Sequence, residues 1–136
     1  TYRHTLDSKN RLFIPARHRD ALGSPIVVYP SIRDRSLKVC SVEEWEKYVN
    51  KIEALPAKER EKALRFFNEN GDTLVPDSQG RIVINQGLVE YSGLSGTAVI
   101  VGCGRSAEIW STEEYDKMKE AVDVDDIRAV LESFGL

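Results

Sequence analysis

The chain repeats itself at a spacing of 70 residues, and this repeat limits its possible folds more than any other feature. The stretch DSKNRLFIP at residues 7–15 matches DSQGRIVIN at residues 77–85, with Asp, Ser, Arg and Ile at equivalent places. The match extends to Ser41 and Ser111, and the offset is expected to hold without a gap. Two copies are too few for a solenoid, so the repeat predicts a pseudo-two-fold unit within one chain.

Each copy is predicted to contain a tight hairpin turn followed by a strand. Asn10 and Gly80 occupy equivalent places, and these two residue types tolerate the positive φ that such a turn requires. The residues after the turn, 12–14 and 82–84, are β-branched, aromatic or aliphatic, which favours a strand.

A short helix is predicted next, because Pro15 can open a helix and Gly23 can close it. Its predicted inner face consists of His18, Ala21 and Leu22. Leu88 takes the place of His18 in the second copy, which favours a packed histidine over a catalytic one.

Two more strands and a longer helix are expected in each copy. The strands are IVVYP and LKVCS in the first copy, and AVIVG and AEIWS in the second. Ser41 with Glu44, and Ser111 with Glu114, have the spacing of a capping box at a helix start. A helix after Pro56 is predicted to link the copies, and a last short helix to begin near Asp123.

Composition favours one core and a polyanionic partner. The 136 residues are 41% hydrophobic and contain no apolar run of the length of a membrane span. The net charge is -3, yet residues 1–40 hold eight Lys or Arg against three Asp. Such asymmetry indicates a basic face, although most basic faces are merely solvated.

Cys40 and Cys103 are far apart, so the sequence predicts a reducing compartment, with no disulfide and no zinc site.

One motif suggests an enzyme. Residues 99–107, VIVGCGRSA, fit the dinucleotide fingerprint G-x-G-x-x-A. A phosphate site of this kind needs a helix starting at the second glycine, whereas residues 107–110 alternate like a strand and the capping box comes only at Ser111. The motif is therefore interpreted as coincidence, and neither a catalytic residue nor a cofactor or metal is predicted.

Together, the two D-S-x-[NG]-R turns, the YSGL segment at 91–94 and the paired S-x-E-E-[WY] helix starts closely resemble the MraZ family of bacterial transcriptional regulators. The resemblance extends more distantly to the AbrB-type swapped-hairpin fold. It implies an α+β fold: a duplicated AbrB-like swapped-hairpin β-barrel with flanking helices and an internal pseudo-two-fold. The expected division is 1–54 for the first repeat, 55–70 for the linking helix, 71–122 for the second repeat and 123–136 for the C-terminal helix.

The resemblance also implies a function: sequence-specific binding of double-stranded DNA at short direct repeats in the promoter of the protein's own operon, within the division and cell wall gene cluster. It further implies a homo-oligomeric ring in the cytoplasm, associated with the nucleoid, with no membrane and no small-molecule substrate. By position, Arg11 and Arg81 would read bases. The predicted phosphate contacts are Lys9, Arg3, Arg17 and Arg19.

The chain departs from the family pattern in three places. Asn10 replaces the commoner glycine, Asn85 stands where proline is usual, and Gly87 with Val89 leave the second short helix without basic residues. The last departure makes the second half the weaker candidate for DNA contact.

Two alternatives stay open at this point. Arg11 and Arg81 could pair with Asp7 and Asp77 and only stabilise the turns, although both roles can coexist. The chain could also be an antitoxin-like module of the same fold that binds a protein partner. RNA is disfavoured, because the turns lack aromatic platforms for base stacking.

Overall fold

The computed structural model describes all residues 1–136 as a mixed α+β fold. The elements of the first half are β1 (Tyr2–Thr5), β2 (Arg11–Phe13), α1 (Ala16–Leu22), β3 (Ile26–Pro30), β4 (Leu37–Ser41), α2 (Val42–Glu53) and the linking helix α3 (Ala57–Asn70). Those of the second half are β5 (Asp72–Leu74), β6 (Arg81–Val83), α4 (Gln86–Ser92), β7 (Thr97–Cys103), β8 (Ser106–Ser111), α5 (Thr112–Ala121) and α6 (Val124–Ser133).

Strand pairing interleaves the two halves. The six-stranded sheet has the order β1-β7-β8-β4-β3-β5, which reads the same from either end when each strand is exchanged for its equivalent in the other half. All pairs are antiparallel, and β2 pairs with β6 in a separate two-stranded ribbon. The tight hairpin predicted within each copy is therefore wrong, because the strands on either side of each turn pair with strands other than each other. The pseudo-two-fold is confirmed.

The core lies between the sheet and the ribbon. Leu12 and Ile82 of the ribbon belong to the same buried cluster as Val28, Val39 and Ile109 of the sheet. The strands divide between an open sheet, with β1 and β5 at its edges, and the ribbon. One continuous closed barrel is thus not shown, although the two sheets enclose a common core.

The repeat is not free of gaps, contrary to the prediction. Val28 lies opposite Val39 in the first half, and Ile100 lies opposite Ile109 in the second. Since Val39 and Ile109 are equivalent at an offset of 70, Val28 corresponds to Ile100, two residues beyond the place that this offset gives. The connection before β7 is longer by two residues, and the turn after it is shorter by two, so the offset is restored in β8.

The predicted turn geometry is confirmed at Asn10 and Gly80, where φ is 58° and 78°. Each turn also binds the chain of the other half. The Ile14 amide donates to the Gly80 carbonyl at 2.9 Å, and the Ile84 amide donates to the Asn10 carbonyl at 2.8 Å. The two turns are therefore held at opposite ends of the ribbon, each beside the strand of the other half.

The short helices follow the sequence prediction with one exception. Pro15 and Gly23 flank α1, and His18 and Leu22 are buried on its inner face, but Ala21 is exposed. In α4 the unusual Asn85 is the N-cap residue, and its side-chain oxygen accepts from the Leu88 amide at 2.9 Å. Asparagine thus replaces the helix-opening proline by capping the helix instead.

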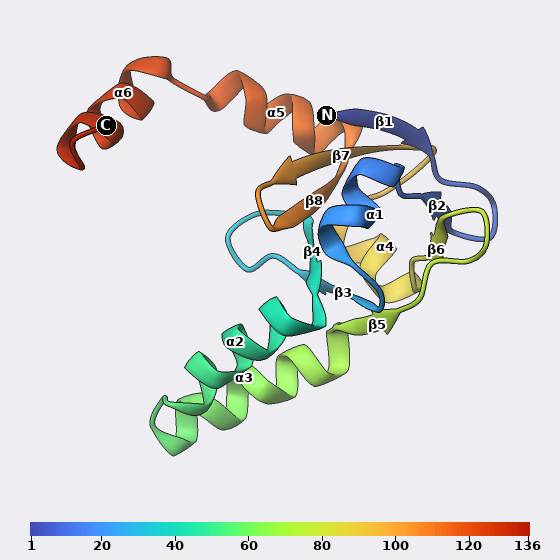
Figure 1. The fold of residues 1–136 in the computed structure, drawn as a ribbon, viewed down its shortest axis with the longest axis horizontal. Helices are drawn as coiled ribbons and strands as arrows, with labels where there is room; N and C mark the ends of the chain where they lie inside the picture. Colours follow the sequence, from blue (N-terminus) through green and yellow to red (C-terminus); the bar gives the residue numbers. More distant parts are fainter.

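The longer helices begin at the predicted caps. The hydroxyls of Ser41 and Ser111 accept from the amides of Glu44 and Glu114, each at 3.1 Å. Helices α2 and α3 form a hairpin that leaves the sheet on one side, and α5 leads to α6 on another (Figure 1). The linking helix begins after Pro56, as predicted, and spans Ala57–Asn70, two residues less at its start than the expected segment 55–70.

The division of the chain at residues 54, 70 and 122 stays a prediction, because interleaved strands join the halves in one core. No helix has the length and apolar character required to cross a membrane.

Candidate nucleic-acid interface

The ribbon of β2 and β6 presents one face to the core and one to the outside. Leu12 pairs with Ile82 at its centre, and both are buried. Because side chains alternate along a strand, the flanking residues point to the opposite face. Arg11 lies opposite Val83, and Phe13 lies opposite Arg81, so the two arginines stand on a diagonal across the outer face.

Each arginine is held by the aspartate of its own turn. Asp7 Oδ1 accepts from the backbone amides of Lys9 and Arg11, both at 2.9 Å, and Oδ2 accepts from Arg11 Nε at 2.6 Å. Asp77 does the same for its turn, with Arg81 Nε at 3.0 Å. The carboxylate therefore shapes the turn and orients the guanidinium at the same time.

The hydrogen bonds leave the far end of each guanidinium free. Only Nε of Arg11 and of Arg81 bonds to a carboxylate, and neither Nη atom of either residue makes a hydrogen bond within the chain. The arginine side chains are 34% and 31% exposed. Pairing with Asp7 and Asp77 is thus present, as the turn-stabilising alternative predicts, and it leaves two donors on each arginine available to a ligand.

The electrostatics of both turns keep the aspartates charged. Hydrogen bonds from the backbone amide of Arg11, then from its side chain and the Lys9 amide, hold the pKa of Asp7 below its usual value. The backbone and side chain of Arg81 do the same to the pKa of Asp77. The anionic form that orients each guanidinium is therefore the form present at neutral pH.

Lys9 and Arg17 are exposed, and their side chains make no ion pair within the chain. Lys9 lies in the first turn beside Arg11, and Arg17 lies on the outer side of α1. Both side chains are available to a ligand, and their phosphate contacts stay predictions.

Arg19 is anchored in its own half and reaches across the pseudo-two-fold to the second turn, which the sequence does not reveal. Its Nε donates to the Ile14 carbonyl at 2.8 Å, and its guanidinium lies 5.6 Å from the centre of the Phe13 ring. A Cβ built on Gly80 would stand 2.7 Å from its Cζ, and Arg19 lines one hollow together with Asp77. The helix α1 therefore supplies a cation to the second turn.

This placement corrects the argument from the second short helix. Gly87 and Val89 do leave α4 without basic residues, but α4 is the helix beside the first turn, where Asn10 Nδ2 donates to Gln86 Oε1 at 3.1 Å. The second turn lies beside basic α1. The lack of charge on α4 is therefore no reason to consider the second turn the weaker one.

Arg3 is not brought to the turns. It pairs with Asp116 of α5 at 3.5 Å, and its guanidinium lies over the Tyr115 ring at 5.5 Å. The next residue, His4, packs on Phe13 at 5.2 Å between ring centres. Neighbouring residues in a strand point to opposite faces, so Arg3 lies on the far side of β1 from the ribbon. Its DNA contact stays a prediction, and the structure gives it a different neighbourhood.

Sequence reasoning missed the apolar part of the outer face. Val83 is 53% exposed, and its equivalent Phe13 is half-buried beside Arg19. The alternation of both strands around Leu12 and Ile82 is the signal that places them there. Such a face combines guanidinium donors with apolar groups, and apolar groups are those that contact thymine methyls in the major groove.

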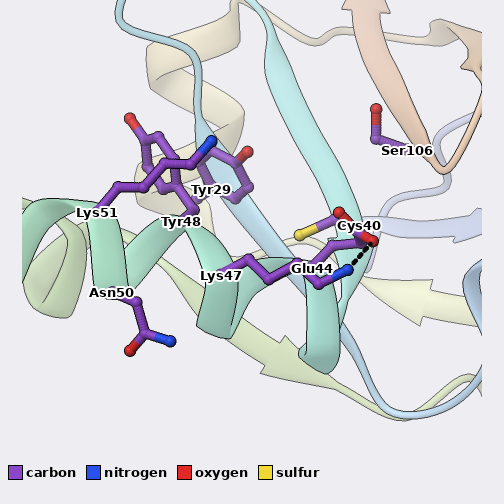
Figure 2. Close-up of a pocket in the computed structure, with 8 residues that line it drawn as sticks. All are labelled: Tyr29, Cys40, Glu44, Lys47, Tyr48, Asn50, Lys51 and Ser106. Carbon is purple, nitrogen blue, oxygen red and sulfur yellow. Dashed lines mark hydrogen bonds and ion pairs between the residues drawn. The ribbon is translucent and has the colours of Figure 1, made fainter.

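The largest hollow lies elsewhere, beside α2. It has a volume of about 570 Å³, and Figure 2 shows Tyr29, Cys40, Tyr48 and Ser106 among its lining residues. Burial raises the pKa of Cys40 to about 11, so this thiol is protonated at neutral pH and poorly nucleophilic. Cys40 is therefore not an activated nucleophile. The glycine motif of residues 99–107 covers the end of β7, the turn after it and the start of β8, as interpreted from the sequence, and no helix starts at its second glycine.

Comparison with known proteins matches both halves of the chain to one family, described as "MraZ protein, putative antitoxin-like", at residues 1–68 and 69–131. The chain belongs to the MraZ family. Its relatives include proteins named "Transcriptional regulator MraZ" from Clostridium beijerinckii, 34% identical over 99% of this chain and 96% of the relative, and from Leuconostoc mesenteroides, 37% identical over 99% and 96%. Another, from Heliobacterium modesticaldum, is 38% identical over 88% of this chain and 84% of the relative.

The two matched segments of the MraZ family correspond to the two halves that the strands interleave. The duplicated family domain is thus confirmed at the levels of sequence and fold.

Proposed function

We propose that this chain is a transcriptional regulator that binds double-stranded DNA through the outer face of the β2–β6 ribbon. One observation carries the proposal: Arg11 and Arg81 are each held at Nε by a turn aspartate, while their Nη atoms stay free. The names of its MraZ relatives, which are those of transcriptional regulators, support it.

The chemistry of the ribbon suits base reading. A two-stranded ribbon fits the major groove, and a guanidinium can donate two hydrogen bonds to O6 and N7 of one guanine, a contact worth about 1–3 kcal/mol of discrimination. A guanidinium already held at Nε loses less conformational freedom on binding than a mobile one. The exposed Lys9 and Arg17 suit phosphates, which add affinity without reading sequence.

The proposed target is a set of short direct repeats in the promoter of the chain's own operon, in the division and cell wall gene cluster. The protein then acts in the cytoplasm at the nucleoid, and needs neither a membrane nor a small-molecule substrate. Several copies assemble into a ring, because one ribbon reaches few phosphates. Linked copies on successive repeats gain about 10²- to 10⁴-fold in avidity.

A fluorescence anisotropy titration tests this function, with promoter DNA and random DNA of equal length at several salt concentrations. Arg11→Ala and Arg81→Ala are each expected to lower the preference for promoter over random DNA by about fivefold or more, since each loses a bidentate base contact. Lys9→Ala is expected to weaken both DNAs alike and to reduce the salt slope by about one.

The matched controls are Arg65→Ala and Lys58→Ala, because both residues are exposed on α3, in the helical hairpin outside the ribbon. They should leave affinity and preference unchanged. A promoter preference that is the same in wild type and in both ribbon variants would refute base reading by these arginines.

The antitoxin-like alternative makes a different prediction. An interaction module would co-purify with a protein partner in a fixed ratio, and DNA binding would be weak and indifferent to sequence. The family description "putative antitoxin-like" and the uncovered face of α6 are the observations that favour it. Mass spectrometry of the protein purified from its native host decides between the two.

A further inference from the structure

The C-terminal helix α6 has an apolar side that nothing in its own chain covers. Its apolar residues recur at helical spacing and are 43% to 78% exposed: Val124, Ile127, Val130, Leu131 and Phe134. The helix leads away from the rest of the molecule (Figure 1). A contiguous apolar face of this kind on an exposed helix marks an interaction site.

The first half contains an equivalent helix that is covered. Helix α3 follows α2 as α6 follows α5. Counted from the first residue of each helix, Leu64 of α3 has the same position as Leu131 of α6, and Phe67 has the same position as Phe134. Phe67 is only 6% exposed, whereas Phe134 is 78% exposed. Helix α6 thus has apolar residues at the same positions as α3, but its apolar side chains are exposed.

The surface that α3 covers consists of aromatic side chains. The Phe67 ring lies 5.8 Å from Tyr29, 5.5 Å from Trp45 and 5.6 Å from Tyr48, measured between ring centres. Tyr29 comes from β3, and the other two come from α2. Figure 2 shows Tyr29 and Tyr48 close together on the same side of α2.

The second half has the equivalent surface, without a helix on it. Val101 of β7 corresponds to Tyr29 of β3, because the offset in these strands is two residues larger than 70. In the helices the offset is 70, so Tyr115 corresponds to Trp45 and Met118 to Tyr48. These three residues lie in one small cluster. The Tyr115 ring is approached by two cations instead of an aromatic ring, Arg3 at 5.5 Å and Lys119 at 6.0 Å.

The end of this surface shows the missing cover most directly. Ile52 of α2 is 6% exposed, whereas its equivalent Val122, at the end of α5, is 51% exposed. The molecule therefore contains a helix with no surface beneath it and, on α5 and β7, the equivalent of the site of α3 with no helix on it. Tyr115 at the centre of this site is 8% exposed, so the open part of the site is its end at Val122.

The connection between α5 and α6 keeps α6 away from the α5–β7 face of its own copy. Ala54, after α2, has helical dihedrals (φ -79°, ψ -5°), and three residues let the chain reverse into α3. Val122 and Asp123, after α5, are both extended, with ψ of 124° and 117°. The Asp123 carboxylate accepts from the Asp125 amide at 2.9 Å, which fixes this start of α6.

We propose that α6 of one copy docks on the α5–β7 face of a second copy, in the place that α3 takes in the first half. The repeat supports a second copy as the partner, because every copy carries both the uncovered helix α6 and the face equivalent to the one that α3 covers in the first half. This docking rests on the proposed assembly of several copies into a ring and names the surfaces that would join them. The contact joins two different surfaces, so repeated contacts close into a ring or continue as a filament.

The experiment measures the mass of the full chain in solution at micromolar concentration, by light scattering after size exclusion. Val130→Asp disables the helix, and Val122→Asp disables the face. Ala129→Asp is the matched control, because it places the same charge one residue away, on the opposite side of α6. Circular dichroism checks that each variant is folded, and all three sites lie outside the buried core.

Wild type and Ala129→Asp are expected to give multiples of the 15.3 kDa chain mass, and each of the other two variants alone to give the single-chain mass. An equal mixture of Val130→Asp and Val122→Asp should form dimers and nothing larger, because one intact helix then meets one intact face.

Two outcomes overturn the docking proposal while ring assembly stands: Val130→Asp assembles like wild type, or the mixture stays monomeric while wild type assembles. A monomeric wild type refutes the assembly itself, whether α6 then folds back on its own α5 or binds a different protein.

Discussion

The guanidinium of Arg19, in the first half of the chain, lies against the backbone of Gly80 in the turn of the second half. A Cβ on Gly80 would stand 2.7 Å from Arg19 Cζ. The two residues are 61 positions apart in sequence, and no local pattern connects them. Swapping of strands between the halves places each short helix beside the turn of the other half.

Gly80→Ala is expected to destabilise the protein in two ways. Its φ of 78° is left-handed, which costs a residue with a Cβ about 1–2 kcal/mol, and the new methyl group must displace Arg19. Gly104→Ala is the matched control, because Gly104 has a φ of 70° with no atom near its Cβ position. Urea unfolding should show a larger loss for Gly80→Ala. Equal losses would mean that the contact with Arg19 adds nothing.

Asp7→Asn tests the orientation of Arg11 by Asp7 independently of the stability of the turn. The amide oxygen can still accept from the backbone amides of Lys9 and Arg11, but the amide NH₂ cannot accept from Arg11 Nε. We expect a several-fold lower preference for promoter DNA, a smaller effect than that of Arg11→Ala, with little change in the thermal midpoint. Anisotropy and thermal unfolding measure the two effects. A DNA preference equal to that of wild type would show that orientation by Asp7 is dispensable.

His18 should make stability depend on pH near neutrality. Its Nε2 is buried without a hydrogen-bond partner, and burial, followed by the charges of the amino terminus and Arg17, lowers its pKa below the ordinary 6.5. The unfolded chain therefore binds a proton first as the pH falls, and the free energy of unfolding should decrease below about pH 6.5.

His18→Leu, which copies Leu88 of the second half, should remove this dependence. Urea midpoints of wild type and variant between pH 7.5 and pH 5 provide the test. Parallel curves for the two proteins would exclude His18 as the source.

Ser111→Ala removes the hydroxyl that accepts from the Glu114 amide at 3.1 Å. Loss of such a cap costs about 1 kcal/mol, and Ser41→Ala should cost a similar amount at the equivalent helix. Ser95→Ala, in the exposed connection before β7, serves as the control and should change little. Chemical unfolding measures all three variants, and a cap variant as stable as the control would contradict the assignment.

Much of the local structure could be predicted from the sequence. Positive φ at Asn10 and Gly80 and the caps at Ser41 and Ser111 follow from residues within four positions of one another. The pairing of Arg11 with Asp7 is local in the same sense, since the two residues are four positions apart. These features depend on short-range hydrogen bonds and backbone sterics, which a short stretch of sequence specifies by itself.

The partner of each strand could not be predicted from local pattern. A hairpin within each copy and a swap between copies satisfy the same alternation of apolar residues, and only packing of the whole chain around one core selects the swap. The two-residue shift of β7 could not be predicted from the sequence either. Gly93 before the strand and Ser106 after it both keep the offset of 70, so the sequence match on either side hides the shift.

The duplication follows from the sequence alone, because it is a repeat of residue types at a fixed spacing. The two aspartate-held turns and the caps follow from it as well, because each depends on residues that are close together along the chain. The tertiary structure alone decided that α1 serves the second turn, that Arg3 faces α5, and that α6 stays uncovered. Those relationships depend on which surfaces meet when distant segments share one core, and on where a two-residue linker directs a helix.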